Sequence, residues 1–245
     1  MRIPVEFQEK QNWWFFLGSC LVFFILALII IAERGFLNEY LHAGLAQKLS
    51  LTGDRHSSWM REDGPLENAT AILTLMSSLF VAGIIVKCKK TLMFRKFSDY
   101  AMTVLLFLSL IFYTGEEISW GQRIFGFDTP NIMQDVNVQQ EFNLHNLKFI
   151  HLYKDGIFSI AVLIWGVILP VVKMFYSKIG KLQDSLRMPL PPIRYVGFFA
   201  AAIGYRVIFK PIYGNAGQEG LEFLFALAMI LMCCHGFFKP RDLFT

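Results

Sequence analysis

Acidic, amide and histidine side chains gather at one end of several long apolar segments of this chain. Carboxylates accept and release protons, and a histidine beside a carboxylate can act as a general base or as a metal ligand. Such groups are costly to hold at or inside a membrane, so a cluster of them marks a candidate functional site. The candidates are Glu62, Asp63, Glu67, Glu116, Glu117, Gln122, Arg123, Glu141, Asn143, His145, Asn146, His151, Arg206, Glu219 and Glu222.

Two adjacent carboxylates, Glu116 and Glu117, stand at the end of one apolar segment, in the sequence GEEISWGQR. Continued as a helix, this segment places Glu116, Trp120 and Arg123 on one stripe and turns Glu117 elsewhere. Trp120 and Arg123 fit a helix end in the headgroup region, where aromatic and basic side chains collect. An interfacial helix end does not explain two neighbouring carboxylates, so we expect at least one of them to have a functional role.

A second candidate pair lies in the amide-rich connection between Asn137 and Asn146. In helical form Glu141 and His145 fall one turn apart on the same face, where they can bind one metal or share a proton. The alternative is structural, with Glu141 or Asn143 capping the next helix and His145 exposed.

A cation in the fifth apolar segment, Arg206, needs a partner. It lies about 18 Å of helix rise beyond Arg194, which places it in the outer half of a membrane. An unpaired guanidinium is expensive there. Glu222 is the first candidate partner, because a short turn around Gly214 joins the two segments, and Glu116 and Glu117 are the next candidates. A structural pair with Glu222 and an anchor for an anionic headgroup are both open.

The segment that begins near Leu66 opens with a proline and several acids. Pro65, Glu62 and Asp63 suit the first turn of a helix, where the proline torsion and the helix dipole favour them. Capping accounts less well for Glu67, which lies further along the segment and closer to the hydrocarbon.

The predicted roles divide the candidates into groups. Glu116, Glu117, Glu141 and His145 are the catalytic candidates, and Glu117, Glu141 and His145 are also candidate ligands for a divalent metal ion. Arg206, Arg123, Gln122, Asn143 and Asn146 are candidates for substrate binding, Arg206 and Glu222 for a structural pair, and Glu62, Asp63 and Glu67 for a further part of the site.

The elements that must position these groups are transmembrane helices. A chain of 245 residues with 55% hydrophobic and 17% charged residues is more apolar than a soluble domain. Crossing about 30 Å of hydrocarbon takes about 20 apolar residues in a helix. The segments of about that length are 13–32, 66–86, 100–119, 156–175, 195–213 and 219–238. We predict an all-α polytopic transmembrane bundle, with one domain over residues 1–245.

Basic residues indicate the orientation of this bundle. Lys and Arg fill the connections at 87–96 and 173–194 and both ends of the chain, and short basic loops stay in the cytoplasm. Both termini are therefore expected in the cytoplasm, and the acidic ends outside. The basic rim suits anionic lipid headgroups, and no nucleic-acid-binding motif is present. The first outer loop, 33–61, predicts a short interfacial helix, and the four cysteines show no metal-ligand spacing.

Two motifs carry a resemblance to a known family. The run GEEISWGQR at 115–123, followed by NVQQEFNLHN at 137–146, resembles the signature of an uncharacterised bacterial multi-pass membrane protein family. The resemblance implies a multi-pass topology in a bacterial inner membrane and carries no activity. A more distant similarity is to the membrane hydrolases that include the alkaline ceramidases, which hold zinc with three histidines. This chain lacks their late His-x-x-x-His pair, so a metal here would need carboxylate ligands.

Three functions are open. The leading prediction is an enzyme that acts on a lipid or lipid-linked substrate by metal-assisted or general acid/base catalysis. The second is a non-catalytic membrane subunit or assembly factor, whose polar outer surface docks a membrane protein partner. The third is an ion- or proton-coupled transporter, although the chain has no internal repeat and few acids on the cytoplasmic side to complete a route across the membrane.

Overall fold

The computed structural model describes residues 14–15, 17–28, 64–94, 96–213 and 215–244. In these ranges the chain is all-α, and an isolated bridge between Asn137 and Leu147 is the single β-type pairing. Helices long and apolar enough to cross a membrane are Pro65–Lys90, Phe97–Glu117, Lys148–Phe175, Ile193–Ile212 and Gly217–Phe238. The protein is therefore an integral membrane helical bundle, as predicted.

Five of the six predicted spans correspond to these helices. The shorter apolar helix Leu17–Leu28 lies inside the predicted first span, 13–32, of which positions 13, 16 and 29–32 lie outside the described residues. The fourth span begins at Lys148 rather than at 156, because one helix includes the polar turn His151–Asp155. The predicted span omits the first two turns of this helix because several of their residues are polar or charged.

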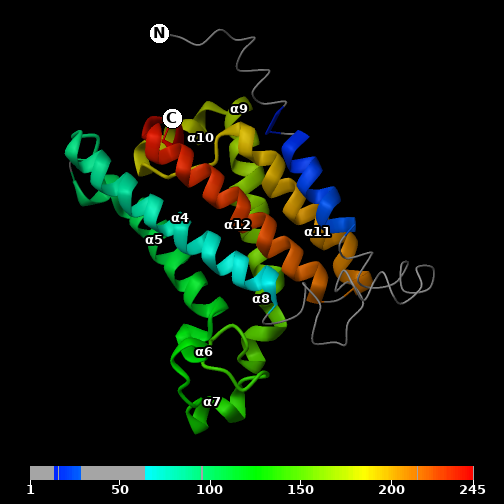
Figure 1. Cartoon of the computed structure of the whole chain (residues 1–245). Helices are drawn as coiled ribbons and strands as arrows, with labels where there is room; N and C mark the ends of the chain where they lie inside the picture. Colours follow the sequence, from blue (N-terminus) through cyan, green and yellow to red (C-terminus); the bar gives the residue numbers. More distant parts are fainter. Residues whose placement is uncertain (1–13, 16, 29–63, 95, 214, 245) are drawn as a thin grey trace.

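The elements follow the chain in the order shown in Figure 1. They are α4 (Pro65–Lys90), α5 (Phe97–Glu117), a 3-10 turn (Ser119–Gly121), α6 (Gln122–Phe125), α7 (Asn131–Val136), α8 (Lys148–Val162), a π-helical segment (Leu163–Ile168), α9 (Leu169–Phe175), α10 (Ser177–Leu186), a 3-10 turn (Ile193–Tyr195), α11 (Val196–Tyr213), α12 (Asn215–Phe238) and a 3-10 turn (Pro240–Leu243).

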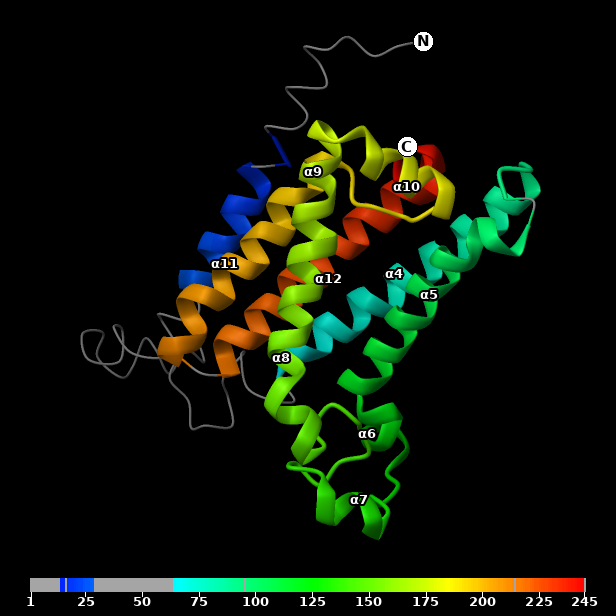
Figure 2. The ribbon, with the colours of Figure 1, turned by 180° about the vertical axis from the view of Figure 1, so that it is seen from behind.

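Helix α12 forms the centre of the bundle, with α4 on one side and α11 on the other (Figures 1 and 2). Helix α5 packs along α4, whereas α8 and the π-helical segment pack on α11. The backbones of α5 and α8 lie apart, and Tyr113 of α5 stacks on Phe158 of α8 with ring centroids 5.4 Å apart. The bundle is therefore a layer of three helices, with α5 and α8 standing apart from each other on it.

Small residues let these helices approach closely. A Cβ at Gly220 would lie 2.0 Å from the Tyr205 ring, and one at Gly217 would lie 2.3 Å from the backbone nitrogen of Lys210. The hydroxyls of Thr74 and Thr114 join α4 to α5 at 2.9 Å. Small residues and interhelical hydroxyl bonds are typical of helix packing in membranes, where lipid provides no hydrophobic drive for helices to associate.

The two ends of the bundle differ in charge. At one end α4 begins, α5 ends, α8 begins, α11 ends and α12 begins (Figure 1). This acidic end carries Glu67, Glu117, Asp155, Glu219 and Glu222. The opposite, basic end carries Lys87, Lys89, Lys90, Lys96, Lys173, Lys178, Lys181, Arg187, Arg194, Lys239 and Arg241.

Candidate active site

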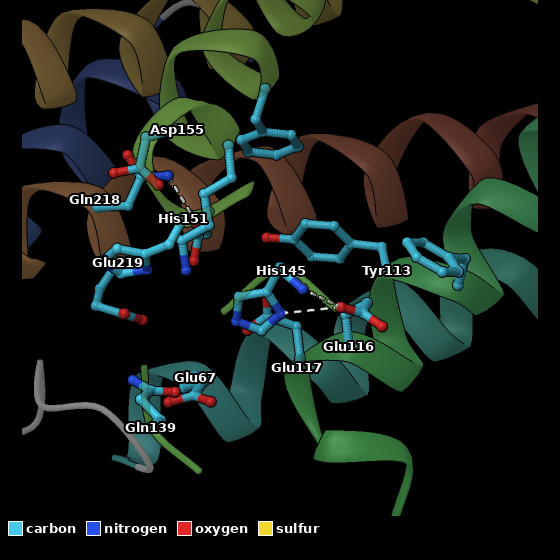
Figure 3. A pocket seen from close by; sticks show the side chains of 14 residues that line it. Glu67, Tyr113, Glu116, Glu117, Gln139, His145, His151, Asp155, Gln218 and Glu219 are labelled. Atoms are coloured by element: carbon cyan, nitrogen blue, oxygen red, sulfur yellow. Dashed lines mark hydrogen bonds and ion pairs between the residues drawn. The ribbon is translucent and has the colours of Figure 1, made fainter. Parts of the chain in front are cut away.

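A cavity of about 210 Å³ opens at the acidic end (Figure 3). It is lined from α4, α5, α8, α12 and the connection between α7 and α8 by Glu67, Phe112, Tyr113, Glu116, Glu117, Gln139, His145, His151, Lys154, Asp155, Phe158, Gln218, Glu219 and Glu222. The central spatial expectation therefore holds, because Glu67, Glu117, His145 and Glu222 meet in one cavity although they are far apart in sequence.

Glu116 is buried, with 4% of its surface exposed, and accepts several hydrogen bonds. Its Oε1 accepts from Nε1 of Trp120 at 2.7 Å. Its Oε2 accepts from the backbone nitrogens of Leu144 and His145, both at 2.7 Å, and lies 3.2 Å from Nδ1 of His145. A carboxylate saturated with donors is held in one position. Glu116 therefore fastens the connection before α8 to the end of α5.

The same contact orients the imidazole of His145. Because Nδ1 faces Glu116, the opposite ring nitrogen, Nε2, is the one that can act in the cavity (Figure 3). A carboxylate that holds Nδ1 in this way fixes the tautomer and the orientation of a histidine base. Glu222 of α12 lines the same cavity as His145. The arrangement is that of a general base beside a second carboxyl group.

Glu117 has quite different surroundings from Glu116. It lies on the cavity wall together with Glu222, Glu67 and Lys154. The hydroxyl of Tyr113 is buried beside the Glu117 carboxyl group and is the one donor side chain directed at it among the cavity residues. Glu117 is thus grouped with other carboxyl groups rather than saturated by donors.

A left-handed turn follows the end of α5, directly after Glu116 and Glu117. Ser119, Trp120 and Gly121 have φ values of 46°, 52° and 83°, and two successive non-glycine residues in this region carry a conformational cost. Trp120 is held by Glu116 and packs on Gly115, where a Cβ would meet its ring at 2.9 Å. The predicted helical continuation to Arg123 is therefore wrong, although the pairing of Glu116 with Trp120 survives.

The connection between α7 and α8 is not helical around Glu141, so the helical spacing proposed for Glu141 and His145 is wrong. Glu141 Oε2 instead accepts from the Ser119 hydroxyl at 2.6 Å and from Nδ2 of Asn143 at 2.9 Å. Glu141 does not line the cavity. Hydrogen bonds from side chains to this irregular backbone take the place of the backbone hydrogen bonds that a helix would form.

The structure does not assemble the predicted metal ligands. Glu117, Glu141 and His145 are divided between the cavity and the loop network, and among the described residues no three His, Cys, Asp or Glu side chains are grouped so that they could hold a metal ion. A carboxylate-rich metal site built on Glu141 and His145 is therefore not supported.

Residues 118–147, here called the cap loop, are tied together by amide side chains. Gln122 Oε1 accepts from the backbone nitrogen of Phe142 at 2.7 Å, and its Nε2 donates to Oγ1 of Thr129 at 2.6 Å. Asn143 Nδ2 also reaches Oγ of Ser119 at 3.1 Å, while Asn146 is bonded to Gln139. Of these amides only Gln139 lines the cavity, so Gln122, Asn143 and Asn146 shape the loop rather than face a substrate.

Arg206 reaches Glu222 through an intervening glutamine. Its Nε donates to Gln218 Oε1 at 3.1 Å, and Gln218 Nε2 donates to Glu222 Oε1 at 2.7 Å. The predicted direct pair is therefore replaced by a relay among the described residues. Arg206 does not line the cavity, so the structure does not place it as an anchor for an anionic headgroup.

Two residues of α8 that the sequence analysis did not single out also belong to the cavity. Asp155 forms an ion pair with Lys210 of α11, and Lys154 Nζ donates to Oδ1 of Asn146 at 2.8 Å. His151, Asp155 and Phe158 recur at helical spacing on the face that lines the cavity. This periodicity, extended back from the apolar run, is the signal that could have found them.

Several predicted residues lie outside the described part of the structure. These are Glu62 and Asp63, together with the expected interfacial helix within 33–61. The backbone of Arg123 lies in α6, but its side chain is outside the described set.

Comparison of the chain with protein-family models, with curated proteins and with solved structures gives no match. The case for a function therefore depends on the geometry of the cavity.

Proposed function

We propose that this protein is a general acid/base enzyme of the bacterial inner membrane, acting at the outer face on a lipid or lipid-linked substrate. The observation that carries the proposal is His145, held by Glu116 through Nδ1 and presented to a cavity that also holds Glu117 and Glu222. A base with an orienting carboxylate and further proton-exchanging groups within one cavity is what acid/base catalysis requires.

The proposed roles follow from the contacts. His145 Nε2 takes a proton from the reacting group, and Glu116 stabilises the imidazolium that forms. Glu117 or Glu222, starting in its protonated form, donates a proton to the leaving group, and the proton held by His145 then restores that carboxyl group. The other carboxyl group hydrogen-bonds the polar part of the substrate. The ion pair of Asp155 with Lys210 and the relay from Arg206 through Gln218 hold the opposite wall in place.

The proposed orientation depends on the basic end of the bundle. Short connections rich in Lys and Arg are retained in the cytoplasm, and the connections at the basic end carry such residues at 87–96 and 173–194. The cavity lies at the other end of the same helices. A substrate in the outer leaflet would meet the cavity at the depth of its polar head.

The test is complementation of a strain that lacks the gene, read by mass spectrometry of extracted lipids. The wild-type chain is expected to restore the lipid profile, whereas Glu117→Gln and His145→Gln lose activity by about 10²- to 10⁴-fold, the usual contribution of a positioned acid or base. Asp128→Asn is the control, because Asp128 is exposed on the cap loop and does not line the cavity. Full restoration by His145→Gln at equal protein level would overturn the proposal.

A second candidate function is a non-catalytic subunit or assembly factor, and one observation favours it. The cap loop exposes large apolar side chains, among them Ile124, Phe125 and Ile132. Exposed apolar clusters on a polar element are common at protein interfaces. Stoichiometric co-purification of a membrane protein that is lost on Phe125→Ser, with the lipid profile unchanged, would favour this function over the enzyme.

A further inference from the structure

An apolar groove continues from the cavity along the side of the bundle. It encloses about 430 Å³ and is lined by Leu106, Leu108, Ser109, Leu110, Phe112, Tyr113, Phe158 and Phe225. Phe112, Tyr113 and Phe158 line the acidic cavity as well, so the two spaces adjoin. One space is rich in carboxyl groups and the other, apart from Ser109 and the Tyr113 hydroxyl, is apolar.

The groove exists because α5 and α8 stand apart. Its lining comes mainly from α5, and α8 and α12 contribute one residue each, Phe158 and Phe225. Phe158 stacks on Tyr113 of α5, with ring centroids 5.4 Å apart, where the groove adjoins the cavity. Leu108 is 53% exposed and Phe112 is 46% exposed, so the groove opens on the outer surface of the bundle. On a membrane-spanning helix that surface faces lipid hydrocarbon.

The groove lies at the level of the lipid hydrocarbon chains rather than at the level of the headgroups. From Tyr113, at the cavity, to Leu106 is about 10 Å of helix rise. Half of a bilayer's hydrocarbon is about 15 Å thick. A molecule whose polar part entered the cavity would therefore lay its apolar part along the groove within a single leaflet.

We propose that the groove binds one hydrocarbon chain of the substrate whose polar head occupies the acidic cavity. This inference rests on the proposed function and adds the substrate class to it. The substrate enters sideways from the membrane between α5 and α8, without passing through the aqueous phase. Sites between the helices of a bundle, apolar with a few convergent polar groups, are typical of ligand binding.

The residues that line the cavity also restrict the chemical type of polar head that the substrate can carry. Six acidic side chains line the cavity, Glu67, Glu116, Glu117, Asp155, Glu219 and Glu222. Glu116 is saturated by donors and Asp155 is paired with Lys210, while Lys154 bonds to Asn146 and Arg206 to Gln218. The acidic groups therefore outnumber the cations at this end. Carboxyl groups accept hydrogen bonds in either protonation state, and those that are ionised repel anions. The head that fits carries hydroxyl or ammonium donors and no negative charge, so phosphate is disfavoured.

The experiment uses photoactivatable single-chain amphiphiles and the full-length protein in lipid nanodiscs. The diazirine is placed in the chain, and the head is an amine, a glucoside or a phosphate. Labelling is read by peptide mass spectrometry. We expect adducts at 105–112 on α5 and at 157–164, which covers the end of α8 and the start of the π-helical segment. The amine or glucoside probe should label more strongly than the phosphate probe.

Two variants locate the bound chain. Ser109 is exposed in the groove, so Ser109→Trp fills the groove without disturbing buried packing and should lower labelling about tenfold, as expected when a few methylene groups lose their contacts. Leu79→Trp on α4 is the control, because Leu79 is 63% exposed and does not line the groove. Its labelling should match that of the wild type.

The outcomes separate this inference from the proposed function. Equal labelling of Ser109→Trp and wild type, or adducts spread over all lipid-facing helices, would refute binding of a hydrocarbon chain in the groove. Neither result would bear on acid/base catalysis, which the complementation test addresses. Preference for the phosphate probe would overturn the assignment of the head. Groove labelling that persists in His145→Gln, while the lipid profile is lost, would support both.

Discussion

At the scale of single residues, the adjacent acids Glu116 and Glu117 have different roles. Glu116 and Glu117 are about 100° apart around α5, so one faces the cap loop and the other the wall of the cavity with Glu222. Because Glu116 accepts hydrogen bonds from several donors, it holds the cap loop to the end of α5 and orients the imidazole of His145. The lack of such saturation makes Glu117 the better candidate for chemistry.

Substitution of each glutamate by glutamine separates these tasks. Glu116→Gln puts an amide against groups that donate to the carboxylate and should cost about 1–3 kcal/mol of stability. Glu117→Gln puts a neutral amide into a crowded cluster of carboxyl groups and should leave the melting temperature equal or higher. Thermal unfolding of both variants in one detergent checks the pair. Equal melting temperatures for the wild type and Glu116→Gln would contradict the fastening role.

At the scale of elements, the positions of α11 and α12 depend on glycine. Tyr205 of α11 lies against the backbone of Gly220, and its hydroxyl donates to the carbonyl oxygen of Leu26 at 3.1 Å. This close approach sets Gln218 between Arg206 and Glu222. The wall of the cavity formed by α12 is therefore a consequence of how tightly two helices pack.

Gly220→Ala tests this packing. Its new methyl would lie 2.0 Å from the Tyr205 ring, and such overpacking should cost about 1–3 kcal/mol. Gly156→Ala in α8 is the control, because a Cβ there meets nothing within 4 Å, and it should stabilise the helix by about 0.5–1 kcal/mol. Thermal unfolding that ranks the two variants in the reverse order would refute the role of Gly220.

At the scale of the whole molecule, charge and polarity are sorted along the bundle axis. One end carries the carboxyl groups and the cap loop, and the other carries the basic connections. Under the positive-inside rule this asymmetry sets one orientation. The cavity, the cap loop and the mouth of the groove would then all belong to the outer side.

Single cysteines introduced into a cysteine-free background test that orientation. Asp128→Cys on the cap loop should react with a membrane-impermeant maleimide on intact cells with the outer membrane opened, since this end faces outward in our proposal. Lys181→Cys in α10 should react only after the inner membrane is made permeable. Both positions lie outside the spans and α10 is at the basic end. The opposite pattern of labelling would reverse the proposed topology.

Most of the fold follows from hydropathy along the sequence. Apolar length predicts each long helix, and the position of acids at the ends of these helices predicts that Glu67, Glu117 and Glu222 meet. Errors occur where polar residues continue a helix, as at Lys148–Asp155, and where amides hold an irregular loop, as around Asn143. Local pattern cannot distinguish these two cases, because both are polar and rich in hydrogen-bonding side chains.

The sequence by itself determined that this is a helical membrane protein with a polar cluster at one end, because burial of apolar length and exclusion of charge from hydrocarbon depend on composition along the chain. The tertiary structure decided which groups work together. His145 pairs with Glu116 rather than with Glu141, because the left-handed turn at Ser119–Gly121 brings the cap loop back over the end of α5. That turn occurs at residues with little intrinsic preference for it, so only long-range contacts could select it.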